Sequence, residues 1–105
     1  MQRQLRFTAA AAEHLRGLAH DPAKKGLYRQ VLKTLGLLEL NPRHPGLQTH
    51  EFQSLSGVNG ERVWEAYAQN QTSCAYRVFF HYGPDEMKGK QRVAILTVVA
   101  ITPHP

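Results

Sequence analysis

Two consecutive stretches decide the fold: Arg62-Val-Trp-Glu-Ala-Tyr-Ala68 and Ala75-Tyr-Arg-Val-Phe-Phe-His-Tyr82. Both are rich in aromatic and β-branched residues, which favour β-strands. Only the six residues 69–74 separate them, and so short a connection predicts an antiparallel pair. A third strand is predicted over Val93–Thr102, which contains the longest apolar run of the chain and follows a polar loop at residues 83–91.

Two helices are predicted ahead of these strands. Thr8 is suited to cap the first, which runs to His20 with its apolar residues on one face. The pair Asp21-Pro22 carries the start signals of the second helix, and Asn41-Pro42 ends it. A short edge strand is expected before both helices, at residues 2–7, because polar and apolar side chains alternate there.

The segment between the helices and the strand pair carries turn signals. Residues 41–50 contain two prolines and a glycine and predict an extended connection, and residues 51–55 are expected to begin sheet structure. Residues 56–60 end in Asn-Gly and predict a turn. The resulting order is β-α-α-β-β-β. We therefore predict one α+β domain over residues 1–105, with an N-terminal strand and a two-helix hairpin packed on one face of a curved antiparallel sheet.

Alternation along the strand pair divides its side chains between the two faces of the sheet. A register that places Tyr67 opposite Arg77 gives one apolar and aromatic set, which we assign to the helix-packed core, and one mixed set, which we expect to face outward. The core set is Trp64, Ala66, Ala68, Tyr76, Val78, Phe80 and Tyr82, and the outward set is Val63, Glu65, Tyr67, Arg77, Phe79 and His81.

Charge and composition limit the classes of binding partner and the cellular location that we expect for this protein. Thirteen Lys and Arg against eight Asp and Glu give a net charge of +5, which favours a polyanionic partner such as nucleic acid. The single cysteine, Cys74, excludes an intrachain disulfide, and it is expected to be a small filler at a strand entry. No apolar run has the length of a membrane span, and charges interrupt the first fifteen residues where a secretory leader would lie. A cytoplasmic protein without membrane contact is expected.

The outward set has the residue types for phosphodiester chemistry. Arg77 can hold a phosphate through two hydrogen bonds and stabilise added negative charge in the transition state. Glu65 or a histidine can accept the proton of a ribose 2′-hydroxyl, and a histidine can return one to the leaving oxygen. His104 is expected to reach this face from the end of the last strand. The same Glu65–Arg77 neighbourhood also fits an ordinary cross-strand ion pair, worth under about 1 kcal/mol.

These stretches resemble the RelE/ParE superfamily of toxins from type II toxin–antitoxin systems. The similarity lies in the order of the elements and in the sequences Leu55-Ser-Gly57, Val63-Trp-Glu-Ala-Tyr67, Tyr76-Arg-Val-Phe-Phe80 and Thr102-Pro-His104. It runs from about Leu5 to the C-terminus. The resemblance implies a bacterial toxin paired with a cognate antitoxin, and in the RelE branch an enzyme that cuts mRNA on the ribosome, inhibits translation and uses no metal or other cofactor.

Site residues follow from the same resemblance. Arg77 matches the arginine that contacts the scissile phosphate, and His104 resembles a C-terminal general acid. Glu51 or Glu65 stands for the general base, and the sequence leaves both open. Predicted RNA contacts are Tyr67, His81, Phe79 and Arg62.

The chain also departs from the RelE pattern. Tyr67 sits where a further arginine is often found. A gyrase inhibitor of the ParE branch, or an inactive toxin-fold binding protein, therefore remains the alternative.

Metal and cysteine chemistry are not expected. The six histidines show neither His-x-His nor His-x-x-x-His spacing; the one alternative is that His44 and His50, which flank a loop, converge with His104. Cys74 lacks the surroundings of a catalytic nucleophile.

Overall fold

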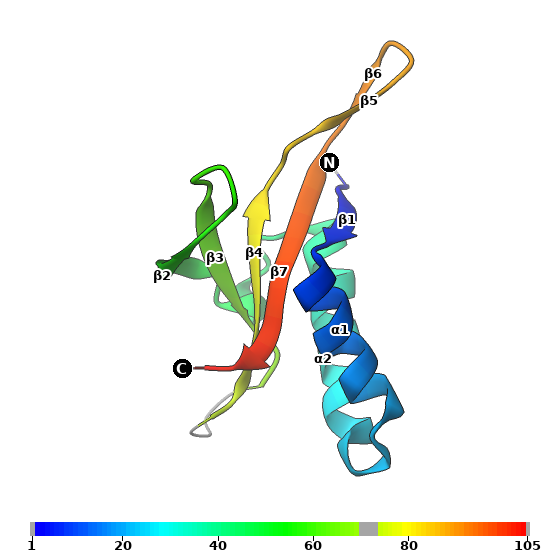
Figure 1. The fold of residues 1–105 in the computed structure, drawn as a ribbon, viewed down its shortest axis with the longest axis vertical. Helices are drawn as coiled ribbons and strands as arrows, with labels where there is room; N and C mark the ends of the chain where they lie inside the picture. The colour runs from blue at the N-terminus through cyan, green and yellow to red at the C-terminus, as the bar shows by residue number, and fades with distance from the viewer. Residues whose placement is uncertain (1, 70–73, 105) are drawn as a thin grey trace.

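In the computed structural model, which describes residues 2–69 and 74–104, two helices cover one face of a mixed five-stranded sheet (Figure 1). The helices are α1 (Ala9–His20) and α2 (Lys25–Leu40). The sheet has the order β1-β7-β4-β3-β2, with β1 (Gln4–Phe7), β2 (His50–Ser56), β3 (Arg62–Tyr67), β4 (Tyr76–Tyr82) and β7 (Ile95–Pro103). The α+β class and the helix pair are confirmed.

Local signals set the helix boundaries as expected. The Thr8 hydroxyl accepts a hydrogen bond from the backbone N–H of Ala11 at 3.1 Å, which satisfies a donor that the first turn of α1 leaves free. The Asp21 carboxylate accepts one from Ala23 N–H at 3.0 Å. Asp21 caps a short 3-10 turn, η1 (Pro22–Lys24), and α2 begins only after it.

The register of the central hairpin is confirmed. Tyr67 lies opposite Arg77 and Glu65 opposite Phe79, so the assignment of side chains to faces holds along both strands. The helix-facing side forms the main core together with Leu47 from the connection after α2. Its buried members are Ala11, Leu18, Val31, Leu35, Leu38, Leu47, Ala66, Val78, Phe80, Leu96, Val98 and Ile101.

The prediction of an all-antiparallel sheet is wrong at one edge. β1 pairs with β7 in parallel, with Leu5 opposite Leu96. The helix pair and three antiparallel strand pairings separate β1 from β7, and together they bring β7 back in the direction of β1. Parallel strands require such a long crossover, which the helix pair helps to supply.

Two other predictions on connecting segments need correction. The polar loop at residues 83–91 contains a small hairpin, β5 (Glu86–Lys88) and β6 (Gln91–Val93), so Val93 belongs to this hairpin and the last sheet strand begins at Ile95 (Figure 1). The connection at 41–50 is not simply extended. It forms a 3-10 turn, η2 (Pro45–Leu47), and this turn places the side chain of Leu47 in the buried core.

The predicted filler role of Cys74 is also wrong. Cys74 is exposed, and its backbone has a φ of 61°. Four of the residues that connect β3 to β4, 70–73, lie outside the described residues. The turn at residues 56–60 forms as expected, with Gly60 at a φ of 82° and its N–H donating to the carbonyl of Gly57 at 2.9 Å. None of the helices within the described residues is long and apolar enough to cross a membrane.

The β5–β6 hairpin is tied to the sheet by one ion pair. The Arg6 guanidinium donates from Nε and Nη2 to the two carboxylate oxygens of Glu86, at 2.9 and 2.7 Å. This bidentate contact lowers the pKa of Glu86 and raises the pKa of Arg6. Both groups are solvent-exposed, so the contact positions the hairpin and adds little to global stability.

We expect the Arg6–Glu86 contact to be lost in acid. Because the folded pKa of Glu86 is lowered, the contact is fully present above the unfolded pKa and disappears as the pH falls through the folded value. The protection factors of the backbone amides of residues 86–93 should therefore fall on acidification, while those of β4 should not. In Glu86→Gln these amides should exchange fast at neutral pH as well; protection equal to wild type would contradict the tether.

Two leucines of α2 give a matched test of the core. Leu38 has no exposed surface and Leu40 keeps 64 % of its own. Leu38→Ala should lower the free energy of unfolding by about 2–5 kcal/mol, because it leaves a cavity beneath the sheet. Leu40→Ala should change it by less than about 0.5 kcal/mol. Urea denaturation of both variants measures the difference, and equal losses would contradict this packing.

Candidate functional site

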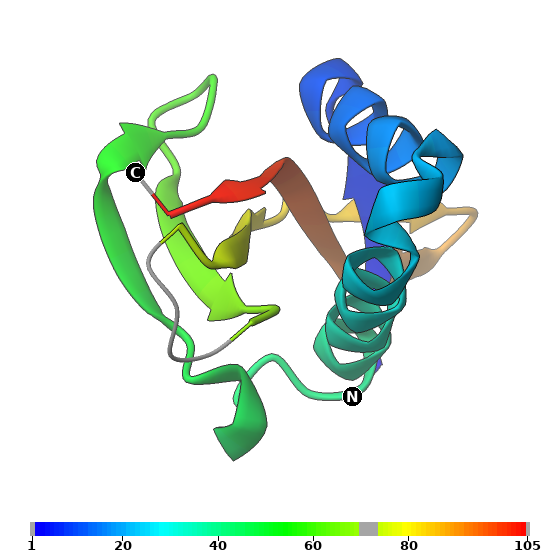
Figure 2. The same cartoon turned by 90° about the horizontal axis from the view of Figure 1, so that it is seen from below.

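The sheet face opposite the helices is largely closed, which corrects the expectation of an outward-facing set. Glu65, Arg77, Phe79 and His81 are all buried, and so is Val63. The cause is the path of β2 and β3, which curve away from the helices and fold over this face (Figure 2). Phe52 of β2 packs on Phe79 with 4.9 Å between the ring centroids. The face is therefore a second, smaller core with charged members.

Glu65 is the centre of this second core. Its side chain has no exposed surface, and three nitrogen-bearing groups approach its carboxylate. Arg77 Nε lies 3.1 Å and His104 Nε2 3.2 Å from Oε1, and His50 Nε2 lies 3.3 Å from Oε2. These four residues, which we name the Glu65 cluster, come from β2, β3, β4 and the segment after β7.

The contacts within the Glu65 cluster are close ion-pair contacts and do not have the geometry of hydrogen bonds. Among the described residues, neither Glu65 oxygen accepts a hydrogen bond of good angle, although all three nitrogens lie within 3.3 Å. A buried carboxylate without compensation is strongly unfavourable, and these three neighbours supply the compensation. Because Glu65 is fully covered, it positions other groups and cannot itself contact a substrate.

The guanidinium of Arg77 makes most of its contacts within the protein. Besides its contact with Glu65, its Nη1 donates to the carbonyls of Gln69 at 2.7 Å and Tyr76 at 3.2 Å. Its guanidinium also stacks on the Tyr67 ring, with 3.7 Å from Cζ to the ring centroid. Only 8 % of the side chain is exposed, so little of the guanidinium can reach a ligand from solvent.

His50 was not among the residues that the sequence indicated for this site. It lies opposite Glu65 in the β2–β3 register, and Nδ1 is 2.9 Å from the carbonyl of Gln48. With Nδ1 donating to that carbonyl and Nε2 beside the carboxylate, both ring nitrogens have oxygen partners. Yet 48 % of the side chain is exposed, so the ring remains open to a ligand from solvent.

His104 reaches the Glu65 cluster as expected from the end of the last strand. Its backbone N–H donates to the carbonyl of Ala75 at 2.8 Å, and its ring packs edge-on to Phe52 with 6.1 Å between centroids. The side chain is 43 % exposed. Two half-exposed imidazoles therefore share one buried carboxylate.

Other predicted site residues lie elsewhere. Glu51 pairs opposite Trp64, so it points to the other face of β2, where its carboxylate is 3.9 Å from Arg62 Nε. His81 is buried, with Nδ1 3.2 Å from the carbonyl of Tyr82. Neither Glu51, Arg62 nor His81 contacts the Glu65 cluster in the contacts of residues 2–69 and 74–104, and Phe79 is packed under Phe52.

A small apolar hollow adjoins His104. It has a volume of about 260 Å³ and lies between β2 and the end of β7. Phe52, which contacts the ring of His104, forms part of its wall together with Leu55 and Phe79. An aromatic surface beside an imidazole can receive a flat apolar group such as a nucleobase.

Across residues 2–69 and 74–104, no group of three or more His, Cys, Asp or Glu side chains is placed to hold a metal ion. His44 does not join His50 and His104. Its Nδ1 instead accepts a hydrogen bond from the Gly46 N–H at 3.0 Å.

Chemically, the Glu65 cluster can move protons. A carboxylate that contacts an imidazole orients the ring and stabilises its protonated form. With two imidazoles on one carboxylate, one can gain a proton while the other loses one, and the charge around Glu65 then stays constant. Such a pair suits a reaction that needs a general base and a general acid in the same step.

Comparisons with known proteins add no relative. No protein-family model matches the chain, no curated protein matches it, and a search of the solved structures finds no match.

We expect Glu65 to be needed for folding as well as for geometry. Glu65→Gln keeps the shape but leaves Arg77 buried without its counter-charge, so it should lower the free energy of unfolding by about 3–5 kcal/mol. Glu51→Gln is the matched control, because it breaks only an exposed pair and should cost under about 1 kcal/mol. Chemical denaturation of both variants checks this, and a Glu65→Gln variant as stable as the control would show that the cluster carries no buried charge.

Proposed function

We propose that this protein is a RelE-like toxin of a bacterial type II toxin–antitoxin system, an endoribonuclease that cuts mRNA on the ribosome without a metal ion. The observation that supports it most is the sharing of Glu65 by two half-exposed histidines and an arginine. The resemblance of the strand sequences and of the element order to that family adds the substrate class. The net charge of +5 favours the same polyanion.

In the proposed reaction His50 is the general base and His104 the general acid. His50 turns its Nδ1 from the Gln48 carbonyl to a ribose 2′-hydroxyl and accepts the proton there, and the 2′-oxygen attacks the adjacent phosphorus. The bond from phosphorus to the 5′-oxygen breaks, and that oxygen takes a proton from His104. The products are a 2′,3′-cyclic phosphate and a 5′-hydroxyl. This assignment replaces Glu51 and Glu65 as candidate bases, because Glu51 points away from the cluster and Glu65 is covered.

Arg77 has a limited role in this reaction. Its Nε faces Glu65, its Nη1 donates to two backbone carbonyls, and only 8 % of the side chain is exposed, so it offers a phosphate few direct hydrogen bonds. Its charge still favours the extra negative charge of the pentavalent transition state, since the surroundings exclude most water. Tyr67, stacked on the guanidinium, keeps the group in place.

Removing either imidazole should stop cleavage without unfolding the protein. His50→Ala and His104→Ala should each lower the rate of mRNA cleavage on programmed ribosomes by about 10²–10⁴-fold, the usual contribution of a general acid or base. Both side chains are half-exposed and Arg77 still faces Glu65, so far-ultraviolet circular dichroism should still show a folded protein, although the denaturation midpoint should fall because the buried carboxylate loses one neighbour.

His20→Ala is the matched control, because His20 is an exposed residue at the end of α1. It should retain both cleavage and growth arrest on expression. Cleavage at the wild-type rate by folded His50→Ala and His104→Ala variants would end the catalytic proposal.

One observation favours a second function, a gyrase inhibitor of the ParE branch or a toxin-fold protein that only binds a partner. The guanidinium of Arg77 is nearly covered and largely used inside the protein, as expected for a structural ion pair. Inhibition of DNA supercoiling by the purified protein, with no cleavage of ribosome-bound mRNA, would establish this alternative over the nuclease.

A further inference from the structure

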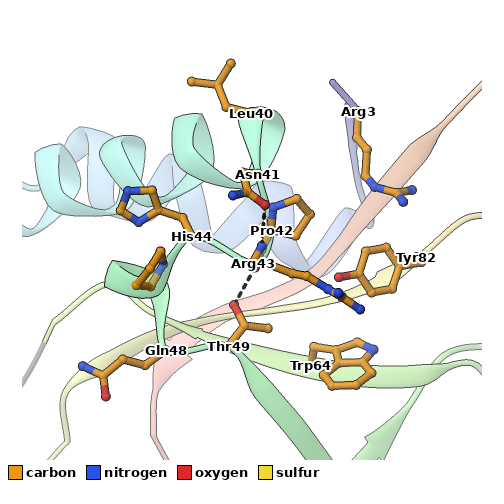
Figure 3. A pocket seen from close by; sticks show the side chains of 11 residues that line it. Arg3, Leu40, Asn41, Pro42, Arg43, His44, Gln48, Thr49, Trp64 and Tyr82 are labelled. Atoms are coloured by element: carbon orange, nitrogen blue, oxygen red, sulfur yellow. Dashed lines mark hydrogen bonds between the residues drawn. The ribbon is translucent and has the colours of Figure 1, made fainter. Parts of the chain in front are cut away.

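A second hollow lies on the helix side of the sheet, away from the Glu65 cluster. It has a volume of about 930 Å³, within the range of about 300–1,000 Å³ that is usual for small-molecule sites. Its walls come from three regions: the start of β1, the connection that follows α2, and the aromatic side chains of Trp64 and Tyr82 (Figure 3). Among the residues that the structure describes, no acidic one lines it.

Two guanidinium groups enter this hollow. Figure 3 shows the side chains of Arg3 and Arg43 reaching toward Tyr82 from different directions. Neither arginine forms an ion pair with a carboxylate in the described residues, whereas Arg6, Arg62 and Arg77 all do. Uncompensated cations in a concave surface concentrate positive potential there, and a guanidinium binds phosphate through paired hydrogen bonds.

The aromatic side of the hollow complements these charges. Trp64 and Tyr82 are half-buried and their rings meet edge to face, with 6.3 Å between centroids. The Arg3 guanidinium already lies 4.8 Å from the centre of the Tyr82 ring. Aromatic rings next to arginine form the usual surface for stacking an unpaired base, whatever its sequence.

The connection after α2 contributes polar groups at the rim. His44 Nδ1 accepts the Gly46 N–H, so the ring proton of a neutral His44 is on Nε2, which can donate outward. The Thr49 hydroxyl donates to the Pro42 carbonyl at 2.9 Å and so retains acceptor capacity (Figure 3). A phosphate needs donors and a base edge needs both kinds of group, and the rim offers both.

We infer that this hollow binds a nucleotide of single-stranded RNA, with its phosphate between Arg3 and Arg43 and its base against Trp64 and Tyr82. An acidic peptide would satisfy the arginines but would leave the aromatic rings without a planar partner. The site is separate from the Glu65 cluster, and RNA binding here does not require that the protein cleaves RNA. Gln48 and Thr49, which line the hollow, precede His50 in the chain.

Trp64 makes the inference directly measurable, because it is the only tryptophan of the chain. Its fluorescence should change saturably on titration with a tetranucleotide whose riboses are 2′-O-methylated. That modification blocks the 2′-oxygen nucleophile, so binding is read independently of cleavage. Inorganic phosphate and a poly-glutamate peptide, the two comparison ligands, should bind at least about tenfold more weakly than the RNA.

Arg43→Ala should weaken binding of the tetranucleotide by about tenfold or more, as expected for a lost charged contact. It should also reduce the slope of log K against log salt concentration by about 0.7, the value of one phosphate contact on a single strand. Arg29→Ala, which removes an exposed arginine of α2 that does not line the hollow, should leave binding within about twofold.

Three results would overturn the inference. The first is the absence of a saturable change in Trp64 fluorescence with the tetranucleotide. The second is equal weakening by Arg43→Ala and Arg29→Ala, which would mean attraction to the overall charge. The third is tighter binding of poly-glutamate than of RNA, which would assign the hollow to an acidic protein segment.

Discussion

The burial of one carboxylate constrains the second face of this sheet. Glu65 has no contact with water, so its charge must be balanced by neighbours that the fold brings within reach. Arg77 supplies the cation from the adjacent strand, and the Nε2 atoms of His50 and His104 complete the surroundings from opposite ends of the chain's second half. Both the curved path of β2 and the position of His104 after β7 therefore bring a histidine to the same carboxylate, that of Glu65. A region that holds such a charge also holds its imidazoles in fixed orientations, which is what proton transfer requires.

Much of the fold follows from local sequence signals. Thr8, Asp21 and the Asn41-Pro42 pair set the helix ends because caps and proline act within a few residues. The β3–β4 register follows from alternation, since a shift by one residue would turn Phe80 out of the core. The parallel pairing of β1 depends on an edge of β7 more than 80 residues away, on which the sequence of β1 carries no information. The β5–β6 hairpin was missed because its polar residues pair outside any core.

The residues of the Glu65 cluster were harder to predict from the sequence than the fold, and His50 is the clearest case. Ser56 pairs with Arg62, so counting back from the turn places Gln53 opposite Glu65. The irregularity between Glu51 and Ser56 shifts the pairing by three residues and places His50 there instead. Such a bulge leaves no pattern in the sequence, whereas Arg77 lies in the regular part of the hairpin and was found. The expectation that Arg77 is exposed failed for the same reason, because it is the curl of β2 that covers this face.

We expected Arg77 to contribute both to catalysis and to phosphate binding, whereas the two proposed sites assign these roles to different residues. Arg77 was expected to bind phosphate, yet it is held by Glu65, Gln69 and Tyr67, so it can add little to affinity for a polyanion. Binding strength must then come from cations that are not neutralised inside the protein, and Arg3 and Arg43 meet that condition. Residues 48 and 49 line the hollow and precede His50 in the chain, so the two proposed sites share one connecting segment. In this proposal proton transfer belongs to the buried Glu65 cluster and attachment to the cationic hollow on the other side of the sheet, so a substitution in one site can leave the other unchanged.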